Sequence, residues 1–264
     1  MLSSKIKRKS SYGILHKWVL IIVGVLAVVL GGGLGVWKAV QPSLRDTSEA
    51  TFFEIQGVSV GAEEYLQSAL AVKHRVQAEC VSKYGARLED EDFWERSYQG
   101  HIPARIAAGL ALEKVKNWHS AFALFKEANL IKDDSFSGLQ RRLEITNREN
   151  KRKIDSGQPV YGLQSYDLST FISYQFSSLT QQYISNPKNP GMEISEGELR
   201  SYYASRNWVD EQGKQAEFEQ VRPQAIKAFR EEKLSRMIAD GAKKMTVQGF
   251  SIEQAATLIQ KEFK

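Results

Sequence analysis

The chain has 264 residues, of which 42% are hydrophobic and 25% are charged, and it contains a single cysteine. These fractions are typical of a folded globular protein and exclude an intrinsically disordered chain. One cysteine, Cys80, excludes an intrachain disulfide and any zinc site of the CxxC type. The net charge of +5 would suit nucleic-acid binding, but its distribution argues against that function.

The excess positive charge lies in a short N-terminal tail. Residues 1–17 contain no acidic residue and five basic ones, namely Lys5, Lys7, Arg8, Lys9 and Lys17. Because these five account for the whole net charge, the rest of the chain is electrically balanced. We therefore expect a cytoplasmic basic tail and no phosphate-binding surface.

Residues 18–37, "WVLIIVGVLAVVLGGGLGVW", carry no charge. A helix of this length reaches about 30 Å, which matches the hydrocarbon core of a bilayer. The segment predicts a single-pass anchor in the cell membrane, which includes Trp18, Leu26 and Trp37. The bulk of the chain would then lie outside the cytoplasm. A cleaved signal peptide is the alternative, but the apolar run is long for one and no A-x-A site follows it.

Three small residues recur at every fourth position of this segment, at Ala27, Gly31 and Gly35. Such a row lets two membrane helices approach closely, so it could support self-association. A flexible exit from the bilayer is the more common explanation for glycine at these positions.

After a linker at residues 38–50, residues 51–264 predict one extracytoplasmic, mainly helical domain with a small β-hairpin. Residues 51–60 read as a strand, a turn at Gly57 and a second strand. Ser195 and Glu198 predict a capping box at a helix that carries a double tyrosine. Apolar spacing and capping signals predict about eight helices in all. The main segments are 62–84, 102–131, 135–154, 167–184, 195–206, 217–245 and 251–264.

The aromatic residues of these helices leave two interpretations open. Most belong in a core, whereas some could line an apolar cradle for unfolded chains, since exposed apolar surface marks a binding site. The sequence does not separate the two groups among Phe122, Phe125, Phe171, Tyr174, Phe176, Tyr202 and Tyr203.

One enzyme motif occurs, because residues 57–61 match G-x-S-x-G around Ser59. The motif works above a parallel sheet, and no further alternation of strands and helices follows it here. The candidate histidines, His74, His101 and His119, also lack the spacing of metal ligands. The acidic run at 89–92 has no calcium-type loop. We therefore assign no catalytic, metal-binding or cofactor-binding residue, and we expect no cofactor.

Two segments carry a resemblance to a known family, "EIQGVSVGAEEYLQ" within residues 54–67 and "EISEGELRSYYASR" at 193–206. The order of elements resembles the chaperone domain of SurA-like and PrsA-like extracytoplasmic foldases. The resemblance departs from the family pattern at Gln56. In that family a parvulin-type prolyl isomerase domain commonly follows the double-tyrosine helix, and residues 207–216 are too short to contain one. The resemblance therefore implies the chaperone part without the isomerase part.

The sequence thus predicts a membrane-anchored, extracytoplasmic chaperone-like protein that binds unfolded or newly exported polypeptides without catalysis and does not bind nucleic acid. Its client-contacting residues remain unassigned. Three alternatives stay open: a family foldase that retains prolyl isomerase activity, a structural or regulatory partner of a membrane protein complex, and a hydrolase that uses Ser59.

Overall fold

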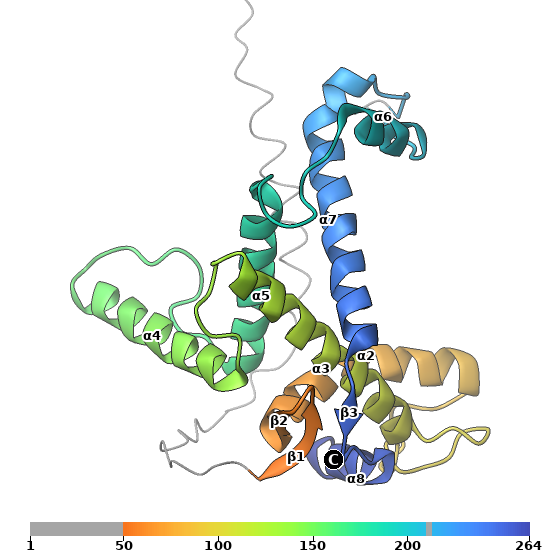
Figure 1. The fold of residues 1–264 in the computed structure, drawn as a ribbon. Helices are drawn as coiled ribbons and strands as arrows, with labels where there is room; N and C mark the ends of the chain where they lie inside the picture. The colour runs from red at the N-terminus through yellow and green to blue at the C-terminus, as the bar shows by residue number, and fades with distance from the viewer. Residues whose placement is uncertain (1–49, 210–212) are drawn as a thin grey trace, which may run out of the picture. The chain divides into compact units, whose positions relative to one another are not determined.

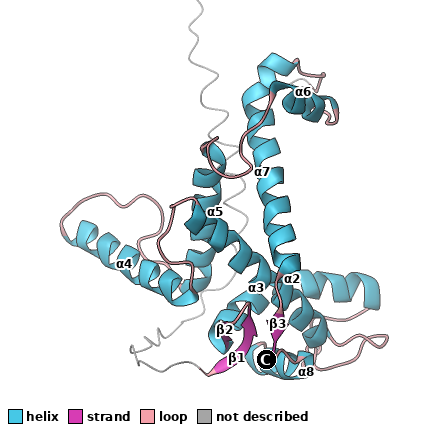
Figure 2. Ribbon diagram, viewed as in Figure 1, coloured by secondary structure: helices cyan, strands magenta, loops and turns pink. Residues whose placement is uncertain are grey.

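The computed structural model describes residues 50–209 and 213–264, which belong to the second of two compact units, Ser48–Lys264. Seven helices and three short strands make up this described part (Figures 1 and 2). The helices are α2 (Ala62–Tyr84), α3 (Pro103–Glu127), α4 (Phe136–Asp155), α5 (Leu168–Ser185), α6 (Glu196–Ala204), α7 (Phe218–Lys244) and α8 (Ile252–Glu262).

The three strands form one small antiparallel sheet in the order β2-β1-β3. β1 (Thr51–Ile55) and β2 (Val58–Gly61) are joined by Gln56 and Gly57, which both have positive φ, at 54° and 75°. Two such residues form the type I′ turn that suits the twist of a hairpin, and glycine adopts it without strain. This confirms the predicted hairpin. The third strand, β3 (Val247–Gln248), was not predicted, and it pairs with the free edge of β1.

The largest apolar core lies between this sheet, α2, the first half of α3, and α8. Phe53, Tyr65 and Phe250 meet there ring against ring. Tyr65 is fully buried, and its hydroxyl donates a hydrogen bond of 2.9 Å to the carbonyl of Ala108. Burial also raises the pKa of the Tyr65 phenol. Helix α8 closes this core with small and branched side chains such as Ile259.

A second core joins the other half of α3 to α4, α5 and α7. Phe125 and Tyr183 are fully buried in it, with ring centroids 6.0 Å apart. The helices α3 and α7 cross closely where Gly241 faces Ser120, since a Cβ at position 241 would collide with that hydroxyl. A larger residue at position 241 would therefore force Ser120 to move, so glycine suits this close crossing.

A third and much smaller core lies between α6 and the N-terminal end of α7. Ser195 and Glu198 form the predicted capping box at α6. Pro223 lies in the second turn of α7, which continues past it. Figure 1 shows α6 beside the N-terminal end of α7, whereas β3 follows the C-terminal end of the same helix.

The predicted fold class needs one correction. The expected anchor at 18–37, with Trp18, Leu26 and Trp37, and the row formed by Ala27, Gly31 and Gly35 lie outside the described residues. Of the helices that residues 50–209 and 213–264 form, none is both long and apolar enough to cross a bilayer. The structure is mainly helical with a small three-stranded sheet, without support for an N-terminal transmembrane helix or for the cell-membrane location based on it.

Candidate client-binding surfaces

The structure resolves which aromatic side chains belong to a core. Phe122, Phe125 and Phe171 are buried. Phe176, Tyr202 and Tyr203 are partly buried, and Tyr174 is 46% exposed. Most of the set therefore stabilises the fold, and Tyr174 and Tyr202 remain as candidates for contact with a partner.

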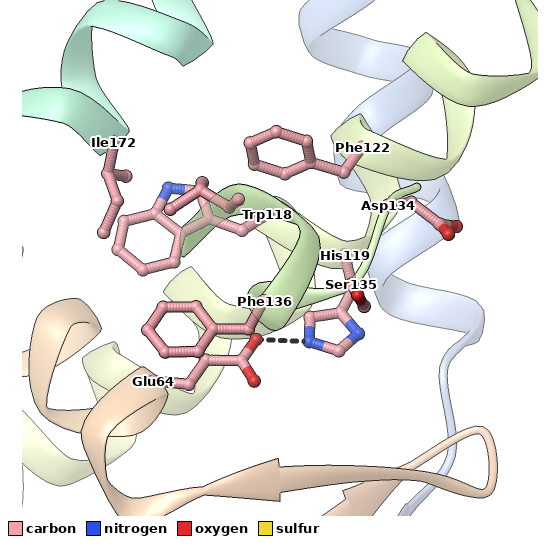
Figure 3. A pocket seen from close by; sticks show the side chains of 9 residues that line it. Glu64, Trp118, His119, Phe122, Asp134, Ser135, Phe136 and Ile172 are labelled. Atoms are coloured by element: carbon pink, nitrogen blue, oxygen red, sulfur yellow. Dashed lines mark hydrogen bonds and ion pairs between the residues drawn. The ribbon is translucent and has the colours of Figure 1, made fainter. Parts of the chain in front are cut away.

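A pocket lies where α2, α3, α4 and α5 meet (Figure 3). Glu64 of α2 and His119 of α3 interact across it at 2.7 Å, beneath the rings of Trp118 and Phe136. Its volume is about 20 Å³. That space holds little more than one water molecule, whereas small-molecule sites measure about 300–1,000 Å³. The Glu64–His119 contact is therefore a polar contact that links α2 to α3.

The other residues considered for chemistry are dispersed. Ser59 is exposed on β2, and its hydroxyl accepts a hydrogen bond of 3.0 Å from Thr51 on the facing strand. His74 is exposed on α2, while His101 stacks on the ring of Tyr84. Within the described part of the chain, no group of three or more acidic, histidine or cysteine side chains could hold a metal ion.

The acidic run at 89–92 serves a structural purpose. Asp90 accepts a hydrogen bond from the hydroxyl of Tyr98 at 2.9 Å and pairs with Arg96 at 3.2 Å. Burial, together with this bond to Asp90, raises the pKa of Tyr98 to about 12. These contacts of the acidic segment therefore stabilise the loop that precedes α3.

Exposed apolar side chains concentrate on α4, on α5 and on the loop between them. Ten large apolar side chains of the described residues are exposed, and five of them lie between residues 145 and 174. We name four of these the arm patch: Ile154, Tyr161, Leu163 and Tyr174, which are 42%, 92%, 50% and 46% exposed. The sequence predicted a helix at 135–154, and helix α4 occupies that segment.

Two asparagines fix the loop that carries Tyr161 and Leu163. The Asn147 amide donates to the carbonyl of Tyr166 at 2.8 Å and accepts from its N–H at 2.9 Å. Asn150 donates to the carbonyl of Leu163 at 3.1 Å. The ring of Tyr166 stacks on Tyr174 with centroids 5.1 Å apart. Sequence reasoning missed both asparagines, although their spacing of three residues on one helix places them on the same face.

A second surface is the groove between α6 and α7. Tyr202 and Phe229 stack in parallel on its floor, with centroids 4.5 Å apart. The groove has a volume of about 420 Å³ and is widely open to solvent. Its flanking cations are neutralised, since Arg206 pairs with Glu232 at 2.7 Å. Similarly, Lys233 lies 3.9 Å from a carboxylate oxygen of Glu198.

No family model matches the chain, and no solved structure matches it. A curated protein named "Chaperone for lacto-N-biosidase", from Bifidobacterium longum subsp. longum, is 28% identical over 159 residues. The matched stretch covers 60% of this chain and 56% of that relative, so the chain spans little more than half the length of the relative it matches.

These comparisons correct the resemblance inferred from residues 55–66 and 194–206. The likeness to SurA-like and PrsA-like foldases is wrong, because no family model supports it and the curated relative is a chaperone of a different description. The relative's name nevertheless agrees with a chaperone-like role for proteins of this kind.

Proposed function

We propose that the chain is a non-catalytic chaperone that binds the non-native form of one dedicated client protein. The observation that carries the proposal is the likeness to a protein named as a chaperone for a particular enzyme, lacto-N-biosidase. The same name suggests the client class, which is an enzyme of the lacto-N-biosidase type.

The chemistry of the arm patch supports a dedicated client. Promiscuous binding surfaces are rich in methionine and flexible, so that they repack around many partners. The arm patch contains tyrosine, leucine and isoleucine instead. Two of its residues lie on the helices α4 and α5, and the other two lie on a loop held by Asn147 and Asn150. Tyrosine presents a large, rigid contact area at low entropic cost. A fixed surface of this composition favours one complementary partner.

Its size supports reversible binding. Apolar side chains of this class contribute about 1.5–3 kcal/mol each when fully buried, so the four residues of the arm patch give at most about 6–12 kcal/mol. Association of two proteins costs about 4–15 kcal/mol in lost freedom and ordering. Because the two ranges overlap, contact through this patch alone gives weak and reversible binding. Weak binding suits a chaperone, because the client must leave once its own core forms and removes the apolar surface from reach.

The test is the refolding of denatured lacto-N-biosidase in the presence of the full chain, with recovered hydrolysis as the measurement. We expect recovery to rise with the amount of chain and to saturate near equimolar ratio, without any nucleotide. An unrelated denatured enzyme serves as the control and should gain little. Unchanged recovery of lacto-N-biosidase at large molar excess would contradict the proposal.

The same titration separates binding from catalysis. A binder acts by mass action and needs about one chain for each client. A foldase with prolyl isomerase activity would reach full recovery at a small fraction of that amount. A structural partner would instead bind the native enzyme and leave its refolding unchanged.

A further inference from the structure

Helix α6 lies on an apolar strip along the N-terminal half of α7 (Figure 1). We name this the α7 strip, and it consists of Phe218, Ala225, Ile226 and Phe229. At about 100° per residue these four positions fall on one face of the helix. Leu199 of α6 is buried against them, so the strip has an occupant in this structure.

The contacts of α6 define the chemistry of this occupant. Tyr202 stacks on Phe229 with ring centroids 4.5 Å apart, and Tyr203 meets Phe218 edge to face at 5.3 Å. Together with Leu199, the two tyrosines place three apolar bodies over the strip from little more than one turn of helix. A short amphipathic helix that lies on an apolar surface is a recurring mode of peptide recognition.

Opposite charges fix the direction of α6 on the strip. Glu196 near its N-terminus pairs with Arg222 at 2.7 Å, and Arg206 beyond its C-terminus pairs with Glu232 at 2.7 Å. Both partners lie on the same face of α7 as the strip. The structure therefore specifies what the strip takes, which is an apolar and aromatic helical turn with an acid at its N-terminal end and a base at its C-terminal end.

The attachment of α6 is weak for a helix that covers apolar surface. The core beneath it has three buried members, and the groove beside Tyr202 leaves about 420 Å³ of the seam open to solvent. The indole N–H of Trp208 is buried without a hydrogen-bond partner among the described residues. Such a donor has lost its hydration without a replacement, and opening of α6 would return water to it. Lids and other moving elements belong to the weakly held parts of a fold.

The chain before α6 is fixed, so the helix has a defined pivot. Arg230 of α7 donates hydrogen bonds to the carbonyls of Met192 and Ile184, at 2.9 and 3.0 Å. Met192 is fully buried in the second core. Lys233 donates to the carbonyl of Glu193 at 2.8 Å. Because all these contacts precede α6, the helix can turn away from α7 without disturbing the second core.

We propose that α6 is a displaceable lid, and that a client segment of the same chemistry replaces it on the α7 strip. This inference rests on the proposed function and adds a second contact to the weak one at the arm patch. A tethered lid competes at an effective concentration of about millimolar, so only a well-matched segment displaces it. Folding of the client buries that segment, and the lid then closes and releases the client.

The first test measures opening of the lid without any client. The probe is a labelled peptide of residues 193–206, which repeats the lid. The wild-type chain should bind it weakly, because apparent affinity falls with the fraction of open molecules. Leu199→Ala in the chain loosens the lid and leaves the strip intact, so the apparent Kd should fall by about tenfold or more. Phe218→Ser with Phe229→Ser, added to that variant, should abolish the gain.

Two controls separate displacement from a general loss of stability. Ile259→Ala truncates a fully buried side chain of similar size in the large core and should leave peptide binding at the wild-type level. A peptide with serine in place of Leu199, Tyr202 and Tyr203 should bind none of the variants. Hydrogen exchange of α2 and α3 shows whether each variant remains folded. If the double strip variant does not, the milder Ile226→Ser takes its place.

The second test is the lacto-N-biosidase refolding assay. A looser lid makes Leu199→Ala the better chaperone, so half-maximal recovery should require severalfold less of this variant than of the wild type. A purely structural α6 predicts the opposite sign, because truncation of its core lowers the amount of folded chain. Free peptide 193–206 should compete with the client and raise the amount of chain needed, whereas the serine version should not.

The outcomes separate this inference from the function on which it rests. If the wild-type chain does not refold lacto-N-biosidase, the proposed function fails. If it does refold the enzyme but Leu199→Ala binds the peptide no better than Ile259→Ala does, the inference fails alone. It also fails if the peptide binds the strip without competing in refolding. A dimer of Leu199→Ala by light scattering would show that the lid of a second copy takes the strip, and would overturn the client as its occupant.

Discussion

The two ends of α7 belong to regions that differ greatly in the number of buried residues that stabilise them. Beyond its C-terminal end, the chain enters a core in which 21 described residues are buried. At its N-terminal end, the core shared with α6 has three buried members, Leu199, Phe218 and Ala225. A region with so few buried contacts can open locally while the rest stays folded. One helix therefore connects a part with an extensive core to a part that can open by itself.

The two regions also differ in what holds them. The α6 end combines a small apolar core with surface ion pairs, which include Arg222–Glu196 at 2.7 Å and Arg206–Glu232 at 2.7 Å. Exposed pairs of this kind contribute little individually and weaken with salt. The large core depends on buried rings, which salt does not screen. The contrast predicts that sequence changes, salt and acid act selectively on one end.

The largest effect is expected for Tyr65→Ala in the large core. Removal of a fully buried aromatic side chain costs about 3–5 kcal/mol of unfolding free energy, because a cavity remains. Chemical denaturation should show this loss as one cooperative shift of the midpoint. Tyr65→Phe keeps the ring and loses the bond to Ala108, so it should cost only about 1 kcal/mol.

A smaller and local effect is expected for Leu199→Ala, which truncates the centre of the α6 core. The substitution costs about 2–3 kcal/mol. Hydrogen exchange should accelerate in α6 and in the first turns of α7, while the amides of α2 and α3 keep their protection. Equal acceleration in all helices would show that the two ends unfold as one unit.

Ser195→Ala removes the hydroxyl that caps α6. The Ser195 hydroxyl accepts from the N–H of Glu198 at 3.2 Å, and loss of such a cap costs about 1 kcal/mol. The exchange of α6 amides should rise less than in Leu199→Ala. Ser195→Asp supplies another capping oxygen and should restore the protection, whereas a failure to restore it would argue against a capping role.

The weakest perturbation is acid. The ion pair with Arg222 lowers the pKa of Glu196 from its ordinary 4.5, hydrogen bonds from Ser195 lower that of Glu198, and Arg206 lowers that of Glu232. A carboxylate whose pKa is lower in the folded state than in the unfolded state stabilises the fold at pH values above its unfolded-state pKa. This stabilisation is lost as the pH falls through the folded-state pKa. The α6 end should therefore loosen first below pH 4.5.

The indole N–H resonance of Trp208 reports on this end, since its ring lies near those of Tyr202 and Tyr203, with centroids 6.3 and 6.5 Å away. The resonance of Trp94 reports on the large core. On acidification the Trp208 signal should shift or broaden first, and added salt should move its transition to higher pH. If both signals changed at the same pH, the prediction that the α6 end opens before the large core would be wrong.

Local signals predicted much of the fold. The hairpin follows from Gly57 between two runs of branched and aromatic residues, and α6 from the capping box at Ser195. β3 carries no such signal, because two residues have no periodicity and their partner strand is distant in sequence. The α6 helix also misled the family assignment. Its double tyrosine has local purposes: Tyr203 donates to the carbonyl of Ala216 at 2.6 Å, and Tyr202 stacks on Phe229.

The candidate surfaces were less accessible from sequence. Phe171 and Tyr174 lie three residues apart on α5, yet one is fully buried and the other is 46% exposed. Their difference depends on which neighbouring helices cover each position, and helical spacing does not contain that information. The two asparagines that hold the loop of the arm patch bond to main-chain atoms. Because every residue has these atoms, the loop sequence does not indicate that the asparagines bind there.

The pairing of β3 with β1 sets a time scale for synthesis. Gln56, beside β1, contacts the carbonyl of Lys244, which follows 188 residues later. At about 5–20 residues per second, a ribosome needs about 10–40 s to cover that distance. For the later part of this interval α2 and α3 are complete but lack β3 and α8, which cover one side of their core. The protein therefore completes its fold late in synthesis. A messenger RNA truncated before α8 would release a chain in which this side of the core is exposed to solvent.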